Sequence, residues 1–321
     1  MSLSIQLDGT IPDDAFGKRL DQVLAQMFPE YSRSRLTQWV RAGQVTLDGL
    51  PCKPKQKCQG GESVKISAQL EETSRVIAQP IELDVVYRDD SLFIINKPVG
   101  QVVHPAAGNP DGTMQNALLY LDESLTAVPR SGIVHRLDKG TSGLLVVART
   151  LAAHHSLVQQ LQARTMHREY LAVANTVLTA GGTIDAPIGR NPRDRLKMAV
   201  VEGGKEAVTH YRVEERYRAH TLVRVQLETG RTHQIRVHMS HRHMPLVGDR
   251  VYAGRFRVPA GVSEALNEML RGFRHQALHA TRLELTHPQT GELCSWSVDM
   301  PEDMQQLVSA LQADRDEAVK S

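Results

Sequence analysis

The sequence predicts an α+β protein, in which a small N-terminal unit precedes a larger domain built on a mixed or antiparallel sheet. This prediction rests on three observations. The 321 residues suffice for about two domains. Short apolar strand patterns and amphipathic helix patterns are mixed, without the regular strand–helix–strand alternation of a parallel sheet. A polar stretch over 71–80 separates the two parts. We therefore expect an N-terminal unit over 1–70 with its core at 17–67, a linker over 71–80 and a large domain over 81–305.

The N-terminal unit begins with two helix patterns. Apolar residues at 20, 23, 24 and 27 follow the spacing of one buried helix face, and those at 36, 39 and 40 form a second stripe. We expect Pro29 to end the first helix, Ser32 to cap the second and Gly43 to stop it. Asp48-Gly49 is typical of a hairpin turn after a strand at 45–47, and 64–66 is a further strand pattern. The unit is thus predicted to be a small α/β module.

Basic side chains decorate this module almost without opposing acids. Residues 31–70 hold seven Lys or Arg and two Asp or Glu. Such a charge excess favours contact with the phosphates of a nucleic acid, although a solvated surface would show the same pattern. The residues concerned are Arg33, Arg35 and Arg41 in the second helix, and Lys53, Lys55 and Lys57 in the loop that follows.

The large domain is predicted to mix strands and helices. Strand patterns occupy 85–87, 92–95, 144–148, 170–174, 222–227 and 283–285, and helix patterns occupy 113–121, 151–162, 233–241 and 263–271. Residues 302–321 are expected to form a short helix that fades into a charged tail over 306–321.

Composition excludes several classes of protein. The net charge is +2, with 23% charged and 41% hydrophobic residues, as in ordinary globular proteins. The three cysteines are too few and scattered for a disulfide framework, and no C-x-x-C exists to bind zinc. The first residues lack the features of a signal peptide, and no apolar run approaches the ~20 residues that span a bilayer. We expect a cytoplasmic protein without a membrane partner.

One polar run stands out because it is set among apolar residues. Asp138 lies between the apolar pair at 133–134 and the strand at 144–148, in a loop rich in glycines and hydroxyls. A carboxylate that leads into a buried strand is costly unless a cation pairs with it. A functional carboxylate and a turn aspartate that binds backbone amides both fit this pattern. No Walker-type or dinucleotide-binding glycine loop occurs, so we expect no nucleotide cofactor.

A second polar run follows the strand at 222–227 and opens a helix. Gly230 breaks the strand, Thr232 is expected to cap the helix, and Arg231 would stand at the corner between them. From there Arg231 is placed to reach another loop. Four histidines at 233, 238, 241 and 243 match no zinc signature, so we expect no metal and interpret them as polar or RNA-facing residues.

Taken in order, these runs resemble the RluA family of pseudouridine synthases. The resemblance extends over nearly the whole chain, and its first segment, from Gly17 to about Ser67, is similar to an S4 RNA-binding module. Gly140 is a departure, because we expect an acidic residue there in most members. The motifs that match are His135-Arg136-Leu137-Asp138 with Thr141-Ser142-Gly143, Asn96-Lys97-Pro98, Arg168-Glu169-Tyr170, Gly230-Arg231-Thr232-His233-Gln234-Ile235-Arg236, and Ala277-Leu278-His279-Ala280.

The resemblance implies the roles of individual residues. Asp138 would be the catalytic carboxylate, Arg231 the guanidinium that keeps it ionised, and Tyr170 the aromatic residue that faces the uracil. Arg136 would fill the space left by the flipped base, and His233 and Arg236 would contact RNA. The fold would be a pseudouridine synthase catalytic domain after an S4-like domain.

The resemblance also implies the reaction. The protein would isomerise uridines in large-subunit (23S) rRNA without a cofactor, as a monomer that meets its RNA in a preribosomal particle. Two other hypotheses remain open at this point. One is a non-catalytic RNA-binding or ribosome-assembly factor, and the other is a magnesium-dependent phosphotransferase that forms an aspartyl-phosphate.

Overall fold

The computed structural model describes residues 3–28, 31, 33–70, 76–106, 108–255 and 258–320. The chain divides into two compact units, Met1–Arg75 and Val76–Ser321. Pro29 and Ser32, expected to end one helix and cap the next, lie outside the described residues, as do residues 71–75 of the expected linker.

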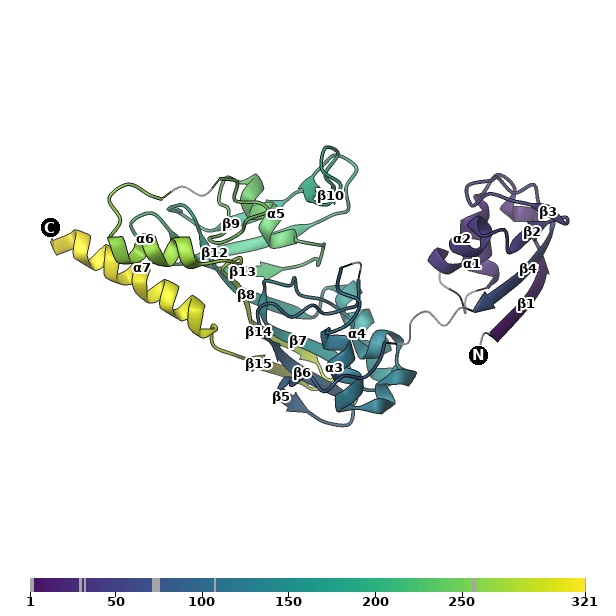
Figure 1. The fold of residues 1–321 in the computed structure, drawn as a ribbon, viewed down its shortest axis with the longest axis horizontal. Helices are drawn as coiled ribbons and strands as arrows, with labels where there is room; N and C mark the ends of the chain where they lie inside the picture. Colours follow the sequence, from purple (N-terminus) through teal and green to yellow (C-terminus); the bar gives the residue numbers. More distant parts are fainter. Residues whose placement is uncertain are drawn as a thin grey trace. The chain divides into compact units, whose positions relative to one another are not determined.

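The N-terminal unit packs two helices on a four-stranded antiparallel sheet of order β1-β4-β2-β3 (Figure 1). The expected turn is confirmed between β2 and β3, where Asp48 and Gly49 have φ of 49° and 77°. Strand β1, which the sequence patterns did not predict, pairs with β4 along its whole length. The elements are β1 (Leu3–Thr10), the 3-10 turn η1 (Asp13–Ala15), α1 (Leu20–Met27), α2 (Arg33–Arg41), β2 (Val45–Leu47), β3 (Leu50–Pro51) and β4 (Ser63–Leu70).

The second unit is built on a nine-stranded sheet. Its order is β5-β6-β7-β14-β8-β13-β12-β9, with β15 paired to β14. Every pairing in this sheet is antiparallel except that of β14 with β7, so the predicted mixed sheet is confirmed. The strands are β5 (Asp84–Arg88), β6 (Leu92–Lys97), β7 (Ser142–Ala148), β8 (His167–Ala174), β9 (Gly182–Asp185), β12 (Val208–Arg216), β13 (Thr221–Leu227), β14 (Leu278–Thr286) and β15 (Leu293–Ser297), and a separate ribbon joins β10 (Ile188–Arg190) to β11 (Met198–Val200).

Helices cover both faces of this sheet. Alternate residues of β6 show the division, because Phe93 and Ile95 pack in the cluster of α3 and α5, whereas Leu92 and Ile94 pack in that of α4. The four expected helices are confirmed. The helical elements are α3 (Met114–Leu121), η2 (Glu123–Ala127), η3 (Pro129–Gly132), α4 (Leu151–Ala163), α5 (Gln234–His241), α6 (Glu264–Gly272) and α7 (Glu302–Lys320).

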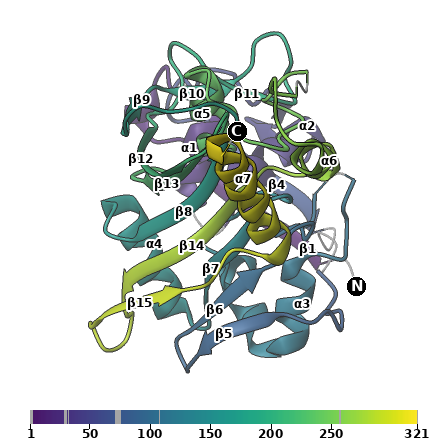
Figure 2. The ribbon, with the colours of Figure 1, turned by 90° about the vertical axis from the view of Figure 1, so that its left-hand side faces the viewer.

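The C-terminal segment differs from the prediction. Instead of a charged tail over 306–321, helix α7 continues to Lys320 and lies across the strands of the sheet (Figure 2). Its buried residues Met304, Leu307, Val308 and Leu311 follow the i, i+3, i+4, i+7 rule and pack against α6. This apolar face keeps the segment helical although charges fill its other side.

The second half of the expected linker belongs to the large unit. Val76 packs against its main core, and Asn116 of α3 donates a hydrogen bond to the carbonyl of Ile77 over 2.8 Å. The backbone amide of Gln79 in turn donates to the carbonyl of Asn116 over 3.0 Å. These contacts place residues 76–80 on the surface of the large unit.

Candidate active site

A cleft of about 920 Å³ opens in the large unit, over the middle of the nine-stranded sheet. Three segments supply most of its polar lining: the loop between η3 and β7, the central strand β8, and the loop that joins β13 to α5. Asp138 comes from the first segment, Tyr170 from the second, and Arg231 and His233 from the third, while Arg236 follows in the first turn of α5. The fold therefore brings the predicted catalytic residues to one cleft.

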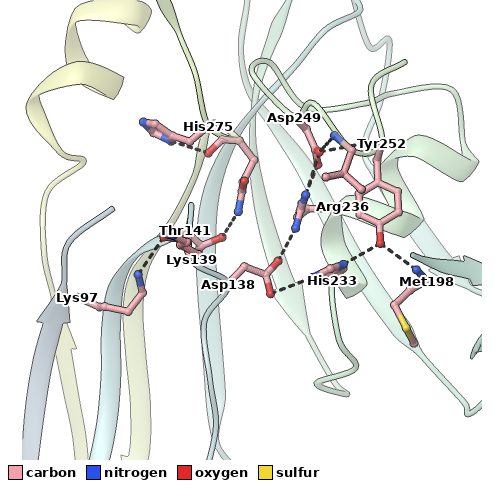
Figure 3. Close-up of polar contacts among 12 residues, drawn as sticks. Lys97, Asp138, Lys139, Thr141, Met198, His233, Arg236, Asp249, Tyr252 and His275 are labelled. Carbon is pink, nitrogen blue, oxygen red and sulfur yellow. Dashed lines mark hydrogen bonds and ion pairs between the residues drawn. The ribbon is translucent and has the colours of Figure 1, made fainter. Parts of the chain in front are cut away.

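Asp138 lies in the loop that leads into β7, with its side chain largely buried. Its Oδ2 accepts a hydrogen bond of 2.9 Å from Nη1 of Arg236, and its Oδ1 lies 3.8 Å from Nε2 of His233 (Figure 3). The guanidinium of Arg236 thus holds the carboxylate on one side by a charge-assisted hydrogen bond. The site thus presents the Asp138 carboxylate to the cleft.

Arg236 is itself fixed by Asp249, on the side of the guanidinium that faces away from Asp138. Its Nε and Nη2 donate to the two carboxylate oxygens of Asp249, over 2.7 and 2.9 Å, and its guanidinium lies 4.9 Å from the ring centre of Tyr252. Burial alone would lower the pKa of Arg236, but the hydrogen bonds and charges of Asp249 and Asp138 raise it. This bidentate grip fixes the direction in which the third nitrogen points.

Arg231, predicted to pair with Asp138, does not do so. Its Nε donates to the backbone carbonyl of Glu206 over 2.8 Å, at the edge of the cleft. The physical reason is that Arg231 precedes helix α5, whereas Arg236 lies in the first turn of that helix and points inward. The predicted cap is also wrong: Thr232 is exposed, and His233 takes the N-cap position with φ of 58°.

His233 is fixed between two neighbours. Its Nδ1 lies 2.7 Å from the hydroxyl of Tyr252, which accepts a hydrogen bond of 3.0 Å from the amide of Met198. Nε2 is the ring nitrogen that faces Asp138. Burial lowers the pKa of His233, against the opposing attraction of Asp138. His233 is therefore neutral at pH 7 and adds no full charge to the site.

Tyr170 belongs to the floor of the cleft. It is 5% exposed and lies in the core cluster of the sheet. No described residue hydrogen-bonds its hydroxyl, although a buried tyrosine hydroxyl usually has a partner. Burial raises the pKa of Tyr170, so the hydroxyl stays protonated at neutral pH.

The loop that holds Asp138 is anchored by Lys97, a residue of the Asn96-Lys97-Pro98 motif whose role the sequence does not reveal. Lys97 is fully buried, and its Nζ donates to the carbonyls of Pro98 and Gln101 over 2.7 and 3.0 Å. A longer contact of 3.5 Å joins the same Nζ to the carbonyl of Lys139, the residue after Asp138 (Figure 3). The amide of Gly100 donates to the carbonyl of Lys139 over 2.8 Å. Burial lowers the pKa of Lys97 to about 8, although Asp138 opposes this effect.

Gly140, the departure from the family pattern, fits its surroundings. A Cβ atom added there would lie 2.6 Å from Oε1 of Gln276, whose Nε2 donates to Thr141 over 3.0 Å. Gln276 occupies the space that a longer side chain at 140 would need, and it braces the loop after Asp138.

The remaining predicted residues are distributed over both units. Arg136 is exposed and lines the cleft next to Asp138. In the N-terminal unit, Arg33 is paired with Asp21 over 2.9 Å and Arg35 is half-buried. The other expected basic residues are exposed: Arg41, Lys53, Lys55 and Lys57.

One of the four histidines interpreted from the sequence as polar or RNA-facing residues has a structural role. His238 is buried, and its ring nitrogens lie 2.9 Å from the hydroxyl of Thr209 and 2.9 Å from the carbonyl of Ala186. Among the described residues, no three His, Cys, Asp or Glu side chains are grouped as metal ligands. Within the same part of the chain, no helix has the length and apolar character that crossing a membrane requires.

Comparison with known proteins identifies the family. Residues 91–241 match the family model described as RNA pseudouridylate synthase, and residues 18–64 match the S4 domain. Proteins named ribosomal large subunit pseudouridine synthase D are 56% identical in Xanthomonas campestris pv. campestris (95% of this chain, 92% of the relative) and 55% identical in Pseudomonas aeruginosa (98% and 99%). The one from Escherichia coli is 54% identical, over 99% of this chain and 98% of the relative.

Solved structures agree with this assignment. The structure titled Human RNA Pseudouridylate Synthase Domain Containing 4 is 25% identical with a TM-score of 0.55, over 71% of this chain and 92% of that one. The expected fold, a catalytic domain of this kind after an S4 domain, is confirmed. The chain therefore belongs to the RNA pseudouridylate synthase family.

Proposed function

We propose that this protein converts uridines of large-subunit rRNA into pseudouridines, with Asp138 as the catalytic carboxylate and without a cofactor. The observation that supports this most directly is the Asp138 carboxylate, which faces the cleft while Arg236 holds it from one side. The relatives that are 54–56% identical are named ribosomal large subunit pseudouridine synthase D, which points to the same class of RNA.

The reaction is an isomerisation and needs no outside oxidant or energy. The bond between C1′ and N1 of the uridine breaks, the uracil turns, a bond forms between C1′ and C5, and the proton lost from C5 is balanced by one gained at N1. Asp138 acts at the sugar carbon as nucleophile or as a negative charge that stabilises it. Arg236 positions the Asp138 carboxylate for this step through its hydrogen bond of 2.9 Å.

Tyr170 faces the uracil during the rotation. Its hydroxyl has no partner among the described residues and its raised pKa keeps it protonated, so it donates a hydrogen bond to the base at neutral pH. The apolar floor around it, including Leu278, offers a surface on which the detached ring turns.

The target uridine must leave its stack to reach the cleft. Flipping costs a few kcal/mol, and less in a loop than in a duplex. Arg136 is exposed beside Asp138, and its planar guanidinium is suited to stack in the gap that the base leaves. The exposed basic residues of the S4 domain supply further affinity through phosphates.

The proposal extends to the setting of the reaction. We propose a cytoplasmic monomer that meets its rRNA in an assembling large subunit.

The test uses a cell that lacks this gene and a pseudouridine-specific chemical probe to map large-subunit rRNA. We expect the wild-type protein to restore pseudouridine at specific positions and Asp138→Asn to restore none. Asp90→Asn is the matched control, because Asp90 is fully exposed. Conversion by Asp138→Asn at the wild-type rate would refute the role of Asp138. Loss of conversion in a chelator would favour a magnesium-dependent reaction instead.

A further inference from the structure

The cleft contains two buried arginines that differ in their partners. Arg236 and Arg168 are 6% and 8% exposed. Arg236 is hydrogen-bonded to two carboxylates, those of Asp138 and Asp249. Arg168 makes no hydrogen bond or ion pair with any described residue, and its Nε is enclosed without a partner. A buried positive charge without a counterion is costly, so Arg168 requires an explanation that packing does not supply.

Arg168 is placed to meet the substrate. It lies on β8 two residues before Tyr170, so both side chains are on the same face of the strand, and both line the cleft. Its charge acts on both Tyr170 and His135: after burial, it is a second cause that lowers the pKa of His135, and it opposes the rise that burial causes in the pKa of Tyr170.

The acids around Arg168 are engaged elsewhere. Glu169, its neighbour in sequence, is hydrogen-bonded to Arg224 and to Gln226. Glu228, which lines the cleft, is paired with Arg164 over 3.1 Å and with His210 over 2.7 Å. The protein therefore directs these carboxylates away from the buried guanidinium.

Gly230 leaves one side of this guanidinium open. A Cβ atom at Gly230 would lie 2.8 Å from Nη1 of Arg168. Gly230 is not among the glycines with positive φ, so its backbone does not require a glycine. The absence of a side chain is explained instead by access to Arg168 from the exposed loop after β13.

We propose that Arg168 binds a phosphodiester of the RNA next to the flipped uridine. This inference rests on the proposed function. At neutral pH the phosphodiester is the group of RNA that bears a full, permanent negative charge, whereas uracil is neutral until its bond to the sugar breaks. A guanidinium matches two phosphate oxygens with its fork of donors. The substrate thus provides the counterion that the free protein lacks.

The test is a set of short RNA substrates, each with one neutral methylphosphonate linkage near the target uridine. For the wild-type protein we expect one linkage to lower kcat/KM by roughly 10- to 100-fold, the range for a hydrogen bond to a charged group. Arg168→Gln should lose a similar factor on unmodified RNA and should be insensitive to that linkage. Fluorescence anisotropy measures the affinity of both proteins for the same RNAs, and so compares their sensitivity to the methylphosphonate independently of catalysis.

Arg164→Gln is the matched control. Arg164 also lines the cleft, but it is exposed and already paired with Glu206 and Glu228, so its variant should keep the wild-type sensitivity. Gly230→Ala keeps the arginine at position 168 but pushes its guanidinium aside. It should therefore reduce, without abolishing, the sensitivity of the protein to the methylphosphonate linkage. This variant tests the inference independently of the folding of Arg168→Gln.

Two results would overturn the inference. One is an Arg168→Gln protein that retains the wild-type sensitivity to the linkage, which would indicate a contact with the base. The other is a wild-type protein whose affinity responds to no linkage. If the proposed function itself were wrong, wild type would not convert unmodified RNA at all, a result that is distinct from both.

Discussion

Arg236 and Asp138 are 98 positions apart in the sequence, and Nη1 of the arginine donates to Oδ2 of the aspartate over 2.9 Å. The other side of the same guanidinium is bound by both oxygens of Asp249, which is 2% exposed. The carboxylate of Asp138, which we propose to be catalytic, is therefore oriented by a charge that is itself held in place by the protein. Such preorganisation avoids the cost of reorganising the site during the reaction.

Arg236→Ala is expected to impair both stability and activity. It leaves Asp249 buried without its counterion, which lowers the free energy of unfolding by about 3–5 kcal/mol. Loss of the hydrogen bond to Asp138 lowers kcat by roughly 10- to 100-fold. Urea denaturation and a single-turnover assay measure the two effects.

Arg231→Ala is the matched control for this variant. Among the described residues its side chain makes one hydrogen bond, to the backbone carbonyl of Glu206, so the loss of stability should be about 1 kcal/mol. If Arg231→Ala lowered kcat as much as Arg236→Ala, the assignment of Arg236 as the partner of Asp138 would be wrong.

Arg136→Ala is expected to act on base flipping. It should slow conversion of a uridine in a structured hairpin, because nothing then fills the vacated stack, and it should spare a uridine in an unstructured oligonucleotide. Rates on the two substrates give the comparison. An equal loss on both would assign Arg136 to another step.

Simultaneous substitution of Lys53, Lys55 and Lys57 by Ala is expected to change the salt dependence of RNA binding. If each exposed ammonium meets one phosphate, the slope of log K against log salt becomes shallower by about 2–3. Lys18→Ala serves as control, because Lys18 is already paired with Asp14 over 3.2 Å. An unchanged slope in the triple variant would exclude this loop from RNA binding.

Lys97→Met is expected to alter how stability depends on pH. The pKa of Lys97 is about 8 in the folded protein, below its ordinary value of 10.5, so between these pH values the unfolded chain binds more protons. The contribution of Lys97 to the free energy of unfolding is constant below about pH 8 and rises above it, by at most about 1.4 kcal/mol per pH unit.

Urea denaturation of both proteins at pH 8, 9 and 10 measures this effect. The wild-type value should rise relative to that of Lys97→Met, in which the titrating group is absent. Parallel pH profiles of the two proteins would contradict a lowered pKa for Lys97.

Much of the architecture followed from local patterns, because a strand or helix that buries one face must repeat apolar residues at a fixed period. The six strand patterns and four helix patterns of the large domain were confirmed for this reason. The length of helix α7 was underestimated because charged residues interrupt its apolar stripe. The stripe itself keeps the helical spacing, with Met304, Leu307, Val308 and Leu311.

The choice between Arg231 and Arg236 could not be made from spacing alone. Both follow the same strand, and only the path of the chain through His233 into α5 decides which one points at Asp138. A signal was nonetheless present, since Arg236 stands between the buried residues Ile235 and Val237, where a charge requires a partner. That partner, Asp249, lies 13 residues away, beyond the reach of local patterns.

The parallel pairing of β14 with β7 has a consequence for the folding of the protein during its synthesis on the ribosome. Strand β14 (Leu278–Thr286) lies between β7 and β8, and β7 follows directly on the loop of Asp138. During translation the sheet beneath the cleft thus lacks its middle strand until nearly nine-tenths of the chain has been made. The apolar core of the N-terminal unit is made of residues between Ile5 and Ala68, all of which are synthesised early. The nascent chain therefore contains the whole S4 domain well before the sheet of the catalytic domain can be completed.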